Sequence, residues 1–139
     1  MKKEVEMKFN ACIENVTFAR NAIAGFVLSQ DLTLNVINEI KTIVSEAVTN
    51  AIVHGYKEDD SKLVTLIIVL DNKLLSITVK DDGVGIENVE KAREPLFSTK
   101  LDNERAGLGF TIMEIFSDTL EITSEKGKGT TVFATKLLS

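Results

Sequence analysis

The stretch of sequence that most limits how this chain can fold is Leu63–Leu70, where Thr65 is the only polar residue. A strand this apolar is expected to have both of its faces covered, because a strand with one face in water alternates between apolar and polar residues. Asp71 and Asn72 follow directly and favour a tight turn, after which residues 74–81 are predicted to form a second strand. The chain must therefore supply other elements that pack on this hairpin.

The segments before the hairpin have their own periodicities. Residues 3–10 alternate between apolar and charged side chains, which is typical of a half-buried strand. Apolar stripes at helical spacing predict a helix over residues 15–29 and a longer one over residues 33–54. The residues expected to cap these helices are Asn15 and Thr33 at the two starts and a left-handed Gly55 after the second helix.

The segment after the hairpin begins with a long irregular loop over residues 82–106, in which one helical turn is predicted near residues 88–92. Loops of this length in a compact domain are usually functional or disordered. A third helix is predicted over residues 108–117, and its inward side chains are expected to be Ile112, Ile115 and Phe116. Residues 119–124 and 130–137 are predicted to close the fold as a hairpin.

The order β-α-α-β-β-loop-α-β-β predicts one domain over residues 1–139. Such an order favours an α+β two-layer sandwich, with a mixed, mainly antiparallel sheet and the helices on one face. A chain of 139 residues is long enough to bury a core of its own.

Composition excludes several classes of function. The net charge is −5 and no cluster of basic residues is visible, so we expect neither direct nucleic-acid binding nor binding to an anionic membrane surface. No apolar run approaches the roughly 20 residues of a membrane helix, and the first residues do not resemble a signal peptide. Cys12 is the only cysteine and cannot form an internal disulfide, which fits a reducing, cytoplasmic location.

The first group of candidate functional residues is Glu46, Asn50 and His54, which recur every four residues and share one face of the second helix. An amide oxygen suits Mg²⁺, which takes most of its ligands from water and phosphates. A carboxylate one turn away can accept the proton of an attacking hydroxyl. A solvated polar face would have the same spacing, and the triplet is not the H-E-x-x-H pattern of zinc proteases.

The second group is Asp81-Asp82-Gly83-Val84-Gly85, directly after an apolar strand. A carboxylate at a strand end can accept a hydrogen bond from the exocyclic amine of adenine, and glycines let the backbone approach a base. An exposed turn with an acidic residue would look the same.

Two further glycine pairs follow. Gly107-Leu108-Gly109 is expected to open a helix whose free amides could hold phosphate, although the same residues suit a loop-to-helix hinge. Gly127-Lys128-Gly129-Thr130 is typical of a hairpin turn, from which Thr130 could reach a ligand. Neither a P-loop nor a Rossmann glycine pattern is present.

The order of these groups resembles the ATPase superfamily that includes gyrase B and histidine kinases. Within that superfamily, Ile40–Tyr56 is similar to the asparagine-bearing helix of the anti-sigma F factors of sporulating bacteria. Pro95–Lys100 resembles the lid of that family, and Glu104–Glu114 resembles the stretch that follows it. The resemblance covers the chain from its first strand to about Lys136 and implies a Bergerat-type ATP-binding fold.

The resemblance also implies an activity and partners. An anti-sigma F factor is a homodimer that binds a sporulation sigma factor with ATP, and a serine/threonine kinase that phosphorylates its anti-anti-sigma factor. ATP, ADP and Mg²⁺ are the implied cofactors. The alternatives that remain open are an ATP-dependent binding module without turnover, an anti-sigma kinase of the general stress response type, and a detached histidine kinase domain.

The resemblance assigns a role to each candidate residue. Asn50 would hold Mg²⁺, and Glu46 would be the general base toward the partner serine. Asp81 would bind adenine, while Arg105 would lie near the γ-phosphate. The other nucleotide contacts would be Gly83, Gly85 and Thr130 at the base, Thr99 and Lys100 in the lid, and Gly107 and Gly109 at the phosphates. Arg20 would contact a partner protein.

Overall fold

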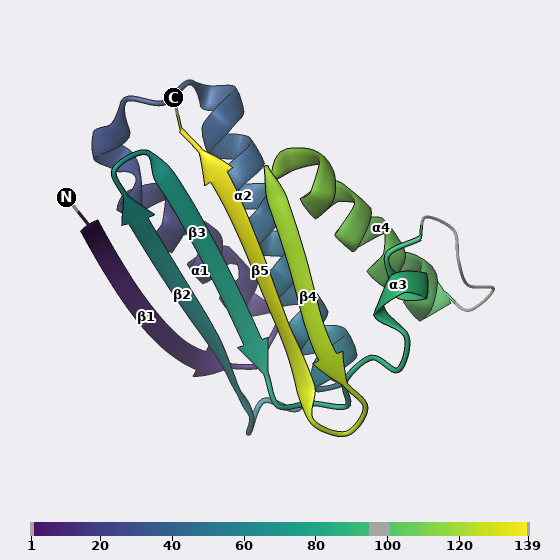
Figure 1. The fold of residues 1–139 in the computed structure, drawn as a ribbon. Coiled ribbons are helices and arrows are strands. Elements are labelled where there is room, and N and C mark those ends of the chain that lie inside the picture. Colours follow the sequence, from purple (N-terminus) through teal and green to yellow (C-terminus); the bar gives the residue numbers. More distant parts are fainter. Residues whose placement is uncertain (1, 95–100, 139) are drawn as a thin grey trace.

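The computed structural model describes residues 2–94 and 101–138, and the side chains of α4 (Leu101–Phe116) from Leu108 onward. Its centre is a five-stranded sheet with the order β1-β2-β3-β5-β4 (Figure 1). Every pair of neighbouring strands in it is antiparallel, so the sheet is antiparallel rather than mixed. The strands are β1 (Lys2–Asn10), β2 (Leu63–Asp71), β3 (Leu74–Asp81), β4 (Thr119–Glu125) and β5 (Gly129–Leu137).

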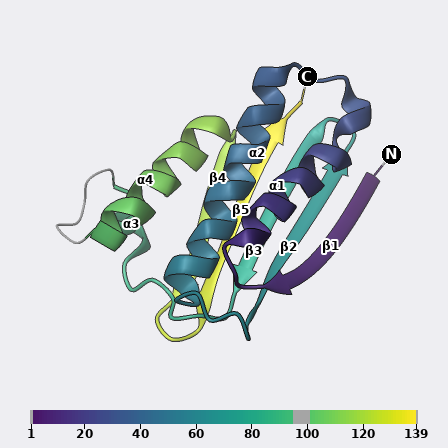
Figure 2. The ribbon, with the colours of Figure 1, turned by 180° about the vertical axis from the view of Figure 1, so that it is seen from behind.

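The helices lie on one face of this sheet, where Figure 2 shows α1, α2 and α4 side by side. The helical elements are α1 (Glu14–Phe26), a 3-10 turn η1 (Leu28–Gln30), α2 (Leu34–Thr49), a π-helical segment η2 (Asn50–Gly55), α3 (Val89–Ala92) and α4. The α+β two-layer sandwich predicted from the sequence is therefore confirmed.

The apolar strand β2 is covered on one face only, which corrects the expectation of two covered faces. Its inward residues Val64, Leu66, Ile68 and Leu70 are buried beneath the helices. The residues between them, such as Ile67 and Val69, are half-buried on the outer face, where no described helix lies. Alternation of burial along a strand follows from the period of two in side-chain direction.

The core lies between the inner face of the sheet and the helices. Helix α2 contributes Ile40, Ile43, Val44, Ala47 and Val48, all buried, as its stripe predicts. On α4 the fully buried side chains are Phe110 and Met113, whereas Ile115 is 70% exposed. The prediction that Ile115 faces inward is therefore wrong, because the face of α4 that meets α2 and the sheet is set by Phe110 and Met113.

Two of the three predicted caps differ in the structure. Thr33 caps α2 as expected, since its Oγ1 accepts a hydrogen bond from the amide of Val36 at 3.3 Å. Asn15 lies inside α1 and donates from Nδ2 to the carbonyl of Asn10 at 2.9 Å instead of capping the helix. Gly55 belongs to the π-helical segment, and the left-handed residues come after it, at Lys57 and Glu58.

Helix α4 begins at Leu101, earlier than predicted, so the segment before it is shorter than residues 82–106. The predicted turn near residues 88–92 is present as α3. Gly107 and Gly109 consequently lie inside a helix rather than at its first turn, and their amides are not the free amides of a helix start. Glycine is about 1 kcal/mol less favourable than alanine in a helix, and for this reason the sequence predicts a helix boundary at these glycines.

Candidate functional site

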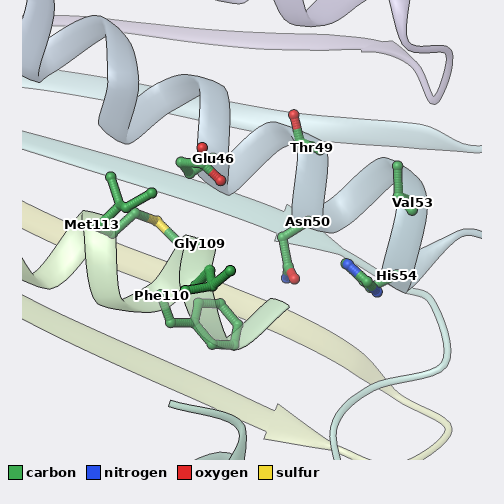
Figure 3. Close-up of a pocket in the computed structure, with 10 residues that line it drawn as sticks. Glu46, Thr49, Asn50, Val53, His54, Gly109, Phe110 and Met113 are labelled. Atoms are coloured by element: carbon green, nitrogen blue, oxygen red, sulfur yellow. The ribbon is translucent and has the colours of Figure 1, made fainter. Parts of the chain in front are cut away.

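A pocket of about 350 Å³ lies between the end of α2 and the described part of α4 (Figure 3). Its lining residues come from two segments far apart in sequence. They are Glu46, Thr49, Asn50, Val53 and His54 from α2 and η2, and Leu108, Gly109, Phe110, Ile112 and Met113 from α4.

The predicted group Glu46, Asn50 and His54 is brought together at this pocket (Figure 3). From Asn50 onward the helix widens to π geometry, with the amide of Tyr56 bonded to the carbonyl of Ala51 at 2.9 Å. Such π segments often occur at functional sites, because they change the direction of the side chains that follow. The three residues therefore line a pocket rather than a solvated helix face.

Asn50 has an unusual side chain. The residue is 7% exposed, and its Oδ1 is the only buried side-chain oxygen or nitrogen of the described residues without a hydrogen-bond partner. Leaving a buried acceptor unpaired costs about 1–3 kcal/mol, so it requires an explanation. A neutral amide oxygen of this kind fits a hard cation such as Mg²⁺, or a water that the cation holds.

The surroundings of Asn50 favour a cation that brings most of its own ligands. Among the described residues there is no group of three His, Cys, Asp or Glu side chains that could hold a metal ion. Mg²⁺ usually keeps several waters and takes one or two protein ligands together with substrate phosphates. The pocket is therefore suited to a Mg²⁺-phosphate complex rather than to a zinc or calcium site made of protein ligands alone.

Glu46 lies one turn before Asn50 and faces the backbone of α4. A Cβ atom on Gly109 would lie only 2.9 Å from Glu46 Oε2, so the missing side chain at position 109 lets the carboxylate approach α4 this closely. The carboxylate of Glu46 therefore lies directly against α4 at this glycine. The carboxylate of Glu46 and the amide of Asn50 are thereby held in one pocket.

Asp81 forms a second group of candidate residues at the end of β3. Its side chain is 6% exposed, and Oδ1 accepts a hydrogen bond from the amide of Gly83 at 2.9 Å. Burial raises the pKa of Asp81 to about 6 and the charge of Asp82 adds to the rise, while hydrogen bonds from the amides of Gly83 and Thr130 oppose it. The carboxylate is therefore mostly ionised at pH 7 and can accept a hydrogen bond.

Three glycines on or near the segment of Asp81 lie where a side chain would clash with the Asp81 carboxylate or with backbone. A Cβ atom on Gly55 would lie 2.6 Å from Asp81 Oδ1, and one on Gly83 would lie 2.0 Å from the carbonyl oxygen of Gly55. Gly85 has φ +73°, and a Cβ there would meet the carbonyl oxygen of Glu125 at 2.1 Å. Gly55 is a member of this group that the sequence reasoning interpreted only as a helix cap.

Thr130 lies opposite Asp81 in the β3–β5 ladder. Its hydroxyl lies 2.8 Å from Ser124 Oγ, which also accepts a hydrogen bond from the amide of Ile86 at 2.7 Å. The sequence reasoning missed Ser124. Ser124 lies on the same face of β4 as Leu120 and Ile122, and a polar residue in this apolar series is the signal that could have identified it.

The two groups are adjacent but separate. Asp81 does not line the pocket that contains Glu46 and Asn50, and the link between them is Gly55, at the end of the segment that begins with Asn50. Arg20 is exposed on α1 and is not among the residues that line the pocket. Thr99, Lys100 and the side chain of Arg105 lie outside the described residues, although Arg105 and Gly107 belong to α4.

Comparison with known proteins fits this geometry. The family description "Histidine kinase-like ATPase domain" matches residues 9–136. The chain is 48% identical, over all of its 139 residues and 95% of the relative, to a protein named anti-sigma F factor from Geobacillus sp. strain WCH70. It is 49% identical to proteins of the same name from Geobacillus thermodenitrificans, over 98% of this chain and 93% of the relative, and from Anoxybacillus flavithermus, over 100% and 95%.

The chain belongs to the anti-sigma F factor family. It is therefore also a member of the histidine kinase-like ATPase domains, as the order of its motifs predicts. A solved structure of the RsbU and RsbW domains of a Mycobacterium tuberculosis protein matches with a TM-score of 0.69 and 18% identity. The match covers 98% of the present chain and 32% of the crystallised chain, and it supports the fold alone.

Proposed function

We propose that this chain is an anti-sigma factor of the sigma F type that uses Mg-ATP to phosphorylate a serine of its anti-anti-sigma factor. The observation that carries the proposal is the buried, unpaired Oδ1 of Asn50, which lines one pocket with the carboxylate of Glu46. Membership of the anti-sigma F factor family supports the choice of partner proteins. No described helix is long and apolar enough to cross a membrane, and we propose that the protein acts in the cytoplasm.

The proposed reaction is a direct phosphoryl transfer. The serine oxygen attacks the γ-phosphorus of ATP, the bond from that phosphorus to the bridging oxygen breaks, and ADP leaves. Glu46 accepts the proton of the serine hydroxyl, which requires its carboxylate to be ionised. Asn50 would hold Mg²⁺ through Oδ1, and the bound cation would supply neutralisation of phosphate charge.

The remaining residues of the site would bind the two ends of the nucleotide. Asp81 would accept a hydrogen bond from the exocyclic amine of adenine, with Gly83, Gly85 and Thr130 beside the base. Gly109 lines the pocket, and we assign Gly107 and Gly109 to the phosphate end of the nucleotide. We assign the neutralisation of the γ-phosphate to Arg105, and contacts from the lid to Thr99 and Lys100.

Transfer of labelled γ-phosphate to a purified anti-anti-sigma factor tests the proposal. We expect the unmodified chain to label a serine, and Glu46→Gln to lose transfer by about 100-fold or more because general base catalysis contributes this much. Glu46→Gln should retain ATP binding, since the carboxylate is not needed to hold the nucleotide. Glu39→Gln is the matched control, because Glu39 lies on α2 outside the pocket and pairs with Lys136 at 3.4 Å.

Three results would count against the kinase. Full transfer by Glu46→Gln would remove Glu46 from the reaction, and label on a histidine would favour a histidine kinase domain. ATP binding without any transfer by the unmodified chain would favour a binding module.

The partner proteins and the dimer belong to the same proposal. Arg20 is exposed on α1, and we assign it to contacts with the sigma factor or the anti-anti-sigma factor. We assign the homodimer contact to the outer face of the sheet, which no described helix covers. Co-purification with the candidate partners, first with ATP and then with ADP, tests the partners, and loss of sigma factor from Arg20→Ala is the expected result.

A further inference from the structure

Tyr56, the only tyrosine of the chain, lies immediately after η2 and joins three segments of the fold. It is 8% exposed, and its hydroxyl donates a hydrogen bond to the carbonyl of Leu63 at 2.8 Å. The same hydroxyl accepts a hydrogen bond from the amide of Asp82 at 2.7 Å. The hydroxyl therefore connects the end of η2 to the start of β2 and to Asp82, the residue after Asp81.

A second hydrogen bond runs beside the first. The amide of Val84 donates to the carbonyl of Gly55 at 2.9 Å, so two consecutive residues, Gly55 and Tyr56, hold the segment from Asp82 to Val84. The carboxylate of Asp81 lies against Gly55 inside this arrangement. The backbone on the C-terminal side of Asp81 is thus fixed by Tyr56, while its side chain is fixed by the amide of Gly83.

We propose that Tyr56 is a positioning residue that sets where the carboxylate of Asp81 meets the adenine base, and so contributes to base selectivity. This inference depends on the proposed function, because it takes Asp81 as the group that binds adenine. Replacement of tyrosine by phenylalanine keeps the buried ring but leaves the amide of Asp82 and the carbonyl of Leu63 without the hydroxyl. The segment from Asp82 to Val84 then loses the hydrogen bond to Tyr56 and keeps the one to Gly55.

The test compares ATP with inosine triphosphate, which carries an oxygen in place of the exocyclic amine. A carboxylate in the correct place favours ATP and disfavours inosine triphosphate, so displacement of Asp81 reduces the ratio of the two affinities. By calorimetry on the full chain, Tyr56→Phe is expected to weaken ATP binding about tenfold, the effect of one hydrogen bond to a charged group, and to change inosine triphosphate binding by less than about twofold. KM for ATP should rise while kcat stays the same.

Thr33→Ala is the matched control. It also removes one hydrogen bond to a backbone amide, but at the opposite end of α2 from Asn50. We expect it to leave the ratio of ATP to inosine triphosphate affinity unchanged. A purely structural role of Tyr56 would instead lower both affinities together.

The outcomes separate the two proposals. If Tyr56→Phe leaves the ratio of ATP to inosine triphosphate affinity unchanged, whether or not both affinities fall, the positioning role alone is overturned. Absence of nucleotide binding by the unmodified chain would overturn both it and the proposed function. If Tyr56→Phe does not fold, fluorotyrosine incorporated at this single site gives one ¹⁹F resonance, which should shift with ATP more than with inosine triphosphate. Equal shifts would overturn the role.

Discussion

At the scale of single residues, the proposed Mg²⁺ ligand Asn50 has a side chain that is buried but incompletely hydrogen-bonded. Its Oδ1 is buried without a hydrogen-bond partner, so the amide contributes little to folding in the absence of ligand. We expect the free energy of unfolding of Asn50→Ala in urea to lie within about 1 kcal/mol of that of the unmodified protein. Most substitutions of buried residues change it by more. The same variant should lose Mg²⁺-dependent ATP binding.

Asn38→Ala is the control for that experiment, because Asn38 is an exposed amide on the same helix. It should preserve both stability and nucleotide binding. Retention of Mg²⁺-dependent binding by Asn50→Ala would remove Asn50 from the site, whatever its stability.

Asp81 predicts a specific dependence on pH. Its pKa in the folded protein is about 6, above the usual 3.8, mainly because the group is buried. The ionised carboxylate is the stronger acceptor for the proposed bond from the adenine amine, so ATP affinity is expected to fall as pH decreases below 6, by at most about tenfold per pH unit. Nucleotide phosphates titrate in the same range, so the measured quantity is the difference between the profiles of the unmodified chain and Asp81→Asn.

The stability of the nucleotide-free protein should change in the opposite direction. A carboxyl with a raised folded pKa favours the folded state fully below 3.8, and this contribution is lost as pH rises through about 6. Urea unfolding at pH 5 and pH 7 measures the effect, and Asp81→Asn should remove it. Identical pH profiles of the unmodified chain and Asp81→Asn would contradict the assignment.

At the scale of elements, the contact between η2 and the segment after β3 has no room for a side chain. A Cβ atom on Gly83 would lie 2.0 Å from the carbonyl oxygen of Gly55, a backbone atom that cannot rotate away. We expect Gly83→Ala to destabilise the protein by roughly 3 kcal/mol, at the upper end for overpacking, and to weaken ATP binding. Urea unfolding and calorimetry measure the two effects.

Gly25→Ala is the matched control on helix α1, where a Cβ atom would meet nothing within 4 Å. Alanine is the better helix former, so this change should stabilise the protein by about 0.5–1 kcal/mol. Equal stabilities of Gly83→Ala and the unmodified protein would show that η2 and the segment after β3 can separate at no cost.

The elements themselves could be predicted from local pattern. Alternation identified β1, and the turn at Asp71 and Asn72 identified the β2–β3 hairpin, because the period of side-chain direction is a local property. The start of α4 could not be predicted, because Gly107 and Gly109 signal a break, although both lie inside the helix. The π-helical end of α2 has no sequence signal of its own.

The candidate site could be predicted in part for the same reason. Glu46, Asn50 and His54 share a face through helical spacing alone, and the structure places them in one pocket. The unpaired state of Asn50 Oδ1 and the contacts of Gly55 arise from the packing of distant segments, which spacing does not encode. Ser124 was missed because one serine in a strand is common, and only its register with Thr130 gives it meaning.

At the scale of the whole molecule, the two faces of the sheet have different surroundings. One is covered by α1, α2 and α4, while no described helix covers the other (Figure 2). Ile67 of β2 and Phe133 of β5 are both paired with Thr78, and the exposed Leu74 and Leu137 are paired with each other. Polar residues such as Ser76, Thr78 and Thr131 lie between these apolar side chains on the same face. Exposed apolar side chains that are rimmed by polar residues are typical of an interaction site. We therefore assign the proposed homodimer contact to this face.

Ile67→Asp tests this assignment, because it would place a charge in the middle of the contact. A buried, unpaired carboxylate costs several kcal/mol, so the dissociation constant of the dimer should rise by about 100-fold or more in sedimentation equilibrium. Ile115→Asp is the control, since Ile115 is 70% exposed on α4, which covers the opposite face. Dissociation by Ile115→Asp alone would instead place the interface on the helical face.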